Sequence, residues 1–130
     1  MGNMITEDYV SFETAKLLKE KGFDSECHSH YYACHRPDGS IQYHLAEIYS
    51  LKSLKDFYLA PTLQMAMKWL REVHKLIPII LDGGNRYWFR IDKDNKDNWK
   101  STIYWEDVKS FPTYEEACEA SIKYCLENLI

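Results

Sequence analysis

The chain has 130 residues, a mass of 15.4 kDa and a formal net charge of −4. A chain of this size buries about two-thirds of its unfolded surface, which is enough for one hydrophobic core, and this predicts a single domain over residues 1–130. A hydrophobic content of 45% excludes a disordered chain. The negative charge disfavours a protein that coats nucleic acid over its whole surface.

No segment has the length of a membrane-spanning helix. The longest apolar run, Leu76–Leu81, is strand-sized, whereas such a helix needs about 20 apolar residues. The four cysteines, at positions 27, 34, 118 and 125, show no compact disulfide pattern. We therefore expect a cytoplasmic protein that has no secretory leader and no membrane partner.

Three segments open with a hydroxyl side chain that can cap a helix N-terminus. The predicted helices follow Ser11, Thr62 and Thr113, and 51 residues separate each cap from the next. Pro61 and Pro112 precede the second and third caps and hold the entering chain extended. The equal spacing leaves two interpretations open, an internal duplication or convergent use of similar capping residues.

The apolar stripes of these helices differ. The third helix has one stripe, which is typical of a surface helix lying on a core, whereas the second helix has two. Two stripes indicate burial on two sides, either at the centre of the monomer or at a subunit contact. We assign the second stripe, Met65, Trp69 and Leu76, to an interface of a homo-oligomer.

A β-hairpin is predicted from Tyr31 to Ile48 because Arg36-Pro37-Asp38-Gly39 favours a type I turn that ends in a left-handed glycine. This turn pairs Cys34 with Gln42, Tyr32 with His44, and His30 with Ala46. Alternation then separates two faces. The core face is predicted to hold Tyr31, Ala33, His35, Ile41, Tyr43 and Leu45, and the wetter face His28, His30, Tyr32, Cys34, Gln42 and His44.

A second hairpin is predicted from Ile77–Leu81 and Arg86–Asp92, joined by Asp82-Gly83-Gly84-Asn85. A polar loop and a strand over Thr102–Trp105 follow. The predicted order is α-β-β-α-β-β-β-α, three helices interleaved with antiparallel hairpins, which indicates an α+β fold.

One candidate site is a metal or thiol site on the wetter face of the first hairpin. His30, Cys34 and His44 are residue types that bind zinc and similar metals, and either imidazole could also serve as a base for the Cys34 thiol. The pattern is weak because no paired Cys or His spacing fixes the ligand geometry. The sequence contains no phosphate-binding loop and no nucleophile elbow, so we expect no enzymatic activity and no cofactor.

The second candidate site is a nucleic-acid-binding strand face. Arg86, Trp88 and Arg90 share one side of their strand, and basic residues around an aromatic ring suit phosphate contact with base stacking. Lysines follow at Lys93, Lys96 and Lys100. The competing interpretation places Trp88 beneath the second helix and the arginines at the sheet edge.

Two resemblances accompany these patterns. The segment Ile79–Ile130, three strands and a helix with Phe111–Ala117 at the junction, resembles the arm-binding domains of phage integrases. Nearly the whole chain resembles a family of small proteins from prophage and mobile-element regions of gut Bacteroides-type bacteria, through Ile5–Asp24, Ala60–His74 and Tyr114–Ala120. The second resemblance implies a bacterial cytoplasm and a phage context, and it carries no activity and no functional residues.

Together these observations predict a small non-enzymatic binding protein. Its expected partner is a second copy of itself or another protein. Nucleic-acid binding and the His/Cys site are the alternatives.

Overall fold

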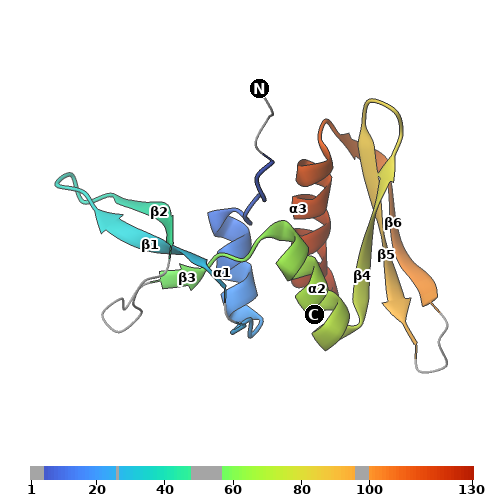
Figure 1. Cartoon of the computed structure of the whole chain (residues 1–130), viewed down its shortest axis with the longest axis horizontal. Coiled ribbons are helices and arrows are strands. Elements are labelled where there is room, and N and C mark those ends of the chain that lie inside the picture. Colours follow the sequence, from blue (N-terminus) through green and yellow to red (C-terminus); the bar gives the residue numbers. More distant parts are fainter. Residues whose placement is uncertain (1–4, 26, 48–56, 96–99) are drawn as a thin grey trace.

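The computed structural model describes residues 5–25, 27–47, 57–95 and 100–130. The fold is α+β with two antiparallel sheets, as predicted (Figure 1). Its elements are α1 (Phe12–Glu20), β1 (Ser29–His35), β2 (Ile41–Glu47), β3 (Phe57–Leu59), α2 (Leu63–His74), β4 (Leu76–Asp82), β5 (Tyr87–Asp94), β6 (Lys100–Phe111), α3 (Tyr114–Tyr124) and a π-helical turn η1 (Cys125–Leu129). Within the described ranges, no helix combines the length and apolar character that crossing a membrane requires.

The predicted order lacks one strand. β3 has only three residues, too few to show an alternating pattern, and it pairs antiparallel with β1 through Tyr31 and Tyr58. The strand orders of the two sheets are β2-β1-β3 and β4-β5-β6. A helix followed by three strands thus occurs twice, but with different strand orders. The equal spacing of the caps is not matched by equal topology, and the duplication stays a prediction.

The three predicted helix caps are confirmed. The hydroxyl oxygens of Ser11, Thr62 and Thr113 accept hydrogen bonds from the first-turn amides of Thr14, Met65 and Glu116 at 3.3, 3.2 and 3.1 Å. These bonds satisfy donors that a helix start otherwise leaves open. The three helix starts are therefore determined locally, by the capping residue and the first turn that follows it.

The second stripe of α2 corrects the interface prediction. Trp69 is 8% exposed and Leu76 is 4% exposed, so neither is available to a partner. α2 lies between α1 and the β4-β5-β6 sheet (Figure 1), and the Trp69 ring packs edge-on against Phe23 with centroids 5.4 Å apart. Both stripes are buried because the helix is central in the monomer; Met65 alone is 36% exposed.

The first hairpin has the predicted turn and register. Gly39 has a φ of 89° and donates to Arg36 at 3.0 Å, and the three predicted pairs occur. Its face assignment holds only near α1, where the Phe12 ring stacks on Tyr43 with centroids 3.9 Å apart. Ile41, next to the turn, is 49% exposed because the hairpin projects beyond the helices (Figure 1), and Leu45, opposite Tyr31 on the edge strand β2, is 42% exposed.

His30 departs from the predicted wetter face, because it is only 5% exposed. Its ring lies beside those of Tyr32 and Phe57, at centroid distances of 6.0 and 6.2 Å. Among the described residues, its Nδ1 has no hydrogen-bond partner. Burial lowers the pKa of His30, because it disfavours the charged imidazolium.

This burial predicts a pH-dependent loss of stability. A His pKa that is lower in the folded state contributes stability that is present above the unfolded pKa of about 6.5 and is lost as pH falls through the folded pKa. We expect the urea midpoint of the wild type to fall between about pH 7.5 and pH 5.5 more steeply than that of His30→Leu, which cannot titrate. Equal slopes for the two proteins would contradict the prediction.

Candidate binding surface on the open face of the second sheet

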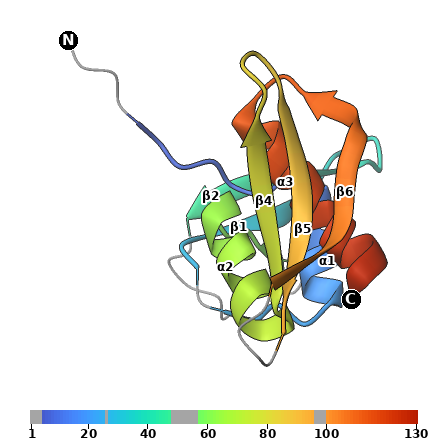
Figure 2. The same cartoon turned by 90° about the vertical axis from the view of Figure 1, so that its right-hand side faces the viewer.

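The β4-β5-β6 sheet has one covered face and one uncovered face. α2 and α3 both lie on the same side of it, and no described helix lies on the other (Figures 1 and 2). On the covered side Phe89 and Ile91 are 2% and 0% exposed. We call the opposite side the open face. Its side chains are Ile77, Ile79, Leu81, Trp88, Arg90, Asp92, Thr102 and Trp105.

The register follows from sequence features that act locally. The turn between β4 and β5 closes with a 2.8 Å hydrogen bond from the amide of Gly83 to the carbonyl of Arg86. Gly84 has a φ of 101°, which glycine adopts without strain. The turn sets Ile79 opposite Arg90. Directly opposite residues of an antiparallel pair share a face, so the β4 isoleucines join the arginine on the open side.

Charged groups on the open face are paired with each other. The Arg90 Nε lies 3.3 Å from Oδ1 of Asp92, and the guanidinium carbon lies 5.9 Å from the centre of the Trp105 ring. The Asp92 residue is 6% exposed, and its carboxylate also accepts a 2.9 Å hydrogen bond from the Thr102 hydroxyl. The face therefore presents a compensated ion pair within an apolar surround.

The Trp88 ring packs closely against Gly83 in the turn between β4 and β5, at one end of the open face. A Cβ added at Gly83 would lie 2.0 Å from Cζ3 of the Trp88 ring, so the indole rests where only a glycine leaves room. Trp88 pairs with Leu81, on the side of the sheet away from α2. The interpretation that places it beneath the second helix is thus wrong.

We expect Gly83→Ala to lower the free energy of unfolding by about 1–3 kcal/mol, because the added methyl group must displace the indole. Urea titration followed by tryptophan fluorescence measures this. The matched background is Trp88→Ala, in which the same glycine substitution should cost almost nothing, since the clashing ring is gone. Equal costs in both backgrounds would show that the contact is not the cause.

The residues predicted for nucleic-acid binding are brought together only in part. Alternation places Trp88 and Arg90 on the open face, and Arg86 lies just before β5. Arg86 is tied across the sheet, because its Nε and Nη2 donate to the hydroxyl and the carbonyl of Ser110. Lys93 and Lys100 are exposed at the end of the sheet away from the turn between β4 and β5. Alternation along β5 places Lys93 on the covered side of the sheet and not on the open face. Lys96 lies outside the described residues.

The residues predicted for the metal or thiol site are not gathered. His30 is buried, Cys34 is partly exposed four positions farther along β1, and His44 is exposed on β2 opposite Tyr32. Among the described residues, no three His, Cys, Asp or Glu side chains form a group that could hold a metal ion. The thiols of Cys118 on α3 and Cys125 on η1 are buried in the core. Burial raises the pKa of Cys118 to about 11 and that of Cys125 to about 12, so both stay protonated at neutral pH.

Sequence reasoning missed the β4 and β6 contributions to the open face. Ile77, Ile79 and Leu81 belong to a continuous apolar run, a pattern typical of strands covered on both faces. That run is the signal in the sequence for a second apolar face, because a strand covered by helices on one side only is expected to alternate apolar and polar residues. The place of Trp105 opposite Arg90 depends on a bulge between the β6 partners of Ile91 and Asp92, which no local pattern announces.

No protein-family model, no curated protein and no solved structure matches this chain. The resemblances to prophage proteins and to integrase arm-binding domains therefore remain predictions, and the open face must be interpreted from its own chemistry.

Proposed function

We propose that the protein works by binding another protein through the open face of the β4-β5-β6 sheet. The observation that carries this proposal is a sheet face lined by isoleucine, leucine and tryptophan on which no described helix packs; Ile77, Ile79, Leu81 and Trp88 are half-buried there and Trp105 is exposed. Trp105 is 49% exposed, and Ile103, the bulge residue between Thr102 and Tyr104 on β6, is 40% exposed. Contiguous exposed apolar surface is typical of interaction sites, and tryptophan and arginine are the residues enriched there.

The charge distribution favours a protein over a nucleic acid. Phosphate binding requires cations that are free to replace counterions. Arg90 is instead paired with Asp92 and packed near Trp105, and Arg86 is bound to Ser110. A neutral apolar centre with a compensated ion pair matches the composition of a protein–protein contact.

Site-specific photocrosslinking in the cells that make the protein tests this proposal. A benzophenone amino acid at Ile103 lies at the bulge of β6, between the open-face residues Thr102 and Trp105. The same amino acid at Ile41 is the matched control, because Ile41 is similarly exposed on the distant first hairpin (Figure 1). We expect protein adducts from position 103 that are absent from position 41. The proposal is wrong if position 103 gives no adduct, or the same adducts as position 41.

A second candidate function is nucleic-acid binding by the same face. One observation favours it. A three-stranded antiparallel sheet has a helix packed on one side and Trp88 and Arg90 on the other, which is the arrangement that the integrase resemblance implies. In a low-salt shift assay with DNA and RNA, this candidate requires binding that Arg90→Ala and Trp88→Ala weaken and that falls steeply with added salt.

A further inference from the structure

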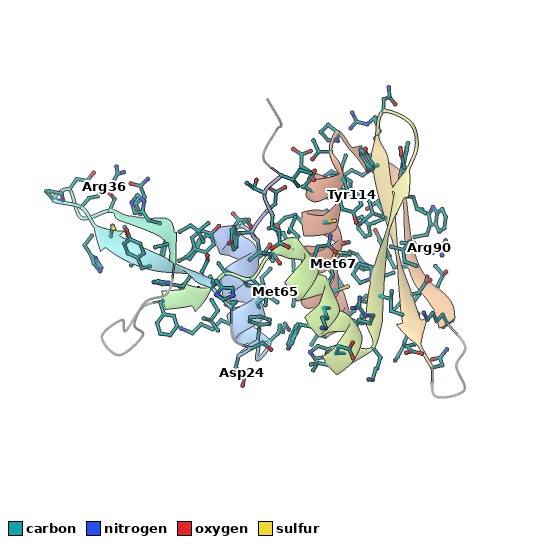
Figure 3. The ribbon with its side chains drawn as sticks, viewed as in Figure 1. Asp24, Arg36, Met65, Met67, Arg90 and Tyr114 are labelled. Atoms are coloured by element: carbon teal, nitrogen blue, oxygen red, sulfur yellow. The ribbon has the colours of Figure 1, made fainter. Side chains whose placement is uncertain are left out.

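We infer that the partner of the open face is a second copy of this chain, packed face to face about a two-fold axis. This inference rests on the proposed function and names its partner. The argument depends on two neighbouring rows of side chains that cross the three strands. The Arg90 row is Ile79, Arg90 and Trp105, and the Asp92 row is Ile77, Asp92 and Thr102. Figure 3 shows Arg90 on the side of the sheet away from the helices.

The two rows complement each other. The two-fold axis lies between the facing sheets, parallel to their planes and perpendicular to the strands, and passes at the level of Ile91. This axis places the Arg90 row of one copy against the Asp92 row of the other. In such an isologous contact every pairing occurs twice. Each Arg90 keeps its own Asp92 at 3.3 Å, and the two ion pairs then face each other in antiparallel orientation, so that the cation of one copy lies over the carboxylate of the other. β5 crosses β5 in the aligned manner of packed sheets.

The flanking side chains fit the same arrangement. Ile79 meets Ile77 of the second copy, so apolar surface covers apolar surface. Trp105, the largest and most exposed side chain of its row, meets Thr102, the smallest of the facing row. Large against small is how facing layers interdigitate. Asp92 is 6% exposed and is paired with Arg90 of its own chain, so the antiparallel ion pairs of the two copies supplement the apolar contact and do not replace it.

The size of the face sets the expected affinity. Three strands about 4.8 Å apart and about seven residues long present roughly 300 Å² in projection. A standard interface buries roughly 800 Å² on each partner. We therefore expect a weak dimer with a dissociation constant of roughly 10–100 µM, which forms and separates with concentration.

Sedimentation velocity of the full chain between about 5 and 500 µM tests the inference across the expected dissociation constant. The wild type should pass from monomer to dimer. Trp105→Lys and Thr102→Glu alter opposite members of one pairing, and each should weaken the dimer by about tenfold or more, since each loses its fit twice in a two-fold contact. Trp105→Lys changes an exposed side chain, and Thr102→Glu replaces the hydroxyl that donates to Asp92, so circular dichroism and urea unfolding check that each variant folds. Leu45→Glu, on the exposed first hairpin, is the control and should dimerise as the wild type does.

Mixing the two variants tests the pairing itself. In the mixed dimer the lysine introduced by Trp105→Lys in one copy faces the glutamate introduced by Thr102→Glu in the other, and the second pairing keeps its native Trp105 and Thr102. An equimolar mixture should therefore contain more dimer than either variant alone at the same total concentration. A mixture no better than its components, or a wild-type dimer insensitive to both substitutions, would overturn the inference.

A wild type that remains monomeric at about 500 µM would also overturn it. That outcome leaves the proposed function standing if the crosslinker at Ile103 captures a different protein. Nucleic-acid adducts at Ile103 would instead favour the second candidate function.

Discussion

Phe89→Ala is expected to lower the free energy of unfolding by about 3–5 kcal/mol, the range for removing a buried phenylalanine from a core. Phe89 is 2% exposed on the covered side of β5. Its ring lies near those of Tyr104, Phe111 and Tyr124, at centroid distances of 5.8, 6.1 and 6.4 Å. It therefore joins β5 to both β6 and α3, and its loss leaves a cavity where the sheet meets the helix. Since domains have a total stability of about 5–15 kcal/mol, this single change removes a large part of it.

The matched control is Trp105→Ala, which removes a larger aromatic side chain from the opposite side of the same pair of strands. Trp105 is 49% exposed and its ring lies near the Arg90 guanidinium, so we expect a cost of at most about 1 kcal/mol. Urea unfolding followed by circular dichroism compares the two at a protein concentration well below the expected dimer range. A Trp105→Ala cost equal to that of Phe89→Ala would mean that the open face is buried, and would remove the basis of the proposed function.

The features that the sequence predicts correctly are those decided within a few residues. The caps at Ser11, Thr62 and Thr113 need only their own first turns. The turn ending at Gly39 likewise fixes the register of β1 and β2 by itself. Alternation along β5 correctly separates Trp88 from Phe89, because strand side chains must point to opposite faces.

The wrong predictions concern which face is covered, and by what. The pattern of α2 requires burial on two sides, but the sequence does not tell a neighbouring element from a second subunit, so the assignment of Trp69 to a subunit contact is wrong. His30 and Leu45 exchange their expected environments because β1 is the central strand of its sheet, with Phe57 of β3 beside His30, whereas β2 is an edge strand. The face with the candidate site is half predicted, through Trp88 and Arg90. The residues that β4 and β6 contribute to this face are not predicted, because their positions depend on pairing across a turn and a bulge.

The difference between the predicted and the observed cover of β4 bears on the proposed function. The open face combines the continuous apolar run of β4, which predicts cover on both sides, with a structure that covers one side only. Such a conflict between local pattern and observed environment is expected at functional positions, where surface is kept apolar for a partner. The positions of Arg90 and Asp92 two residues apart on the central strand give that surface the self-complementarity on which the two-fold arrangement depends.

Glu119→Ala should lower the free energy of unfolding by about 1–3 kcal/mol, because it leaves the buried hydroxyl of Thr14 without its acceptor. Oε1 of Glu119, on α3, accepts hydrogen bonds from the amide of Ser11 at 3.0 Å and from the hydroxyls of Ser11 and Thr14. Thr14 is 0% exposed, so water cannot replace the lost partner without rearrangement. The carboxylate also lies at the N-terminus of α1, where a negative charge is favourable.

The contact matters beyond its own bonds because it holds α1 against α3 across 108 positions of sequence. At the other end of α1, Lys21 Nζ donates to the Ile130 carbonyl at 3.1 Å. Glu119→Gln keeps a carbonyl acceptor for the hydroxyls and removes the charge, so we expect it to recover about half of the loss. Urea unfolding measures both variants, with Glu127→Ala, an exposed acid on η1, as the control. If Glu119→Ala and Glu127→Ala shift the midpoint equally, the carboxylate does not join the two helices, and α1 is held by its apolar face alone.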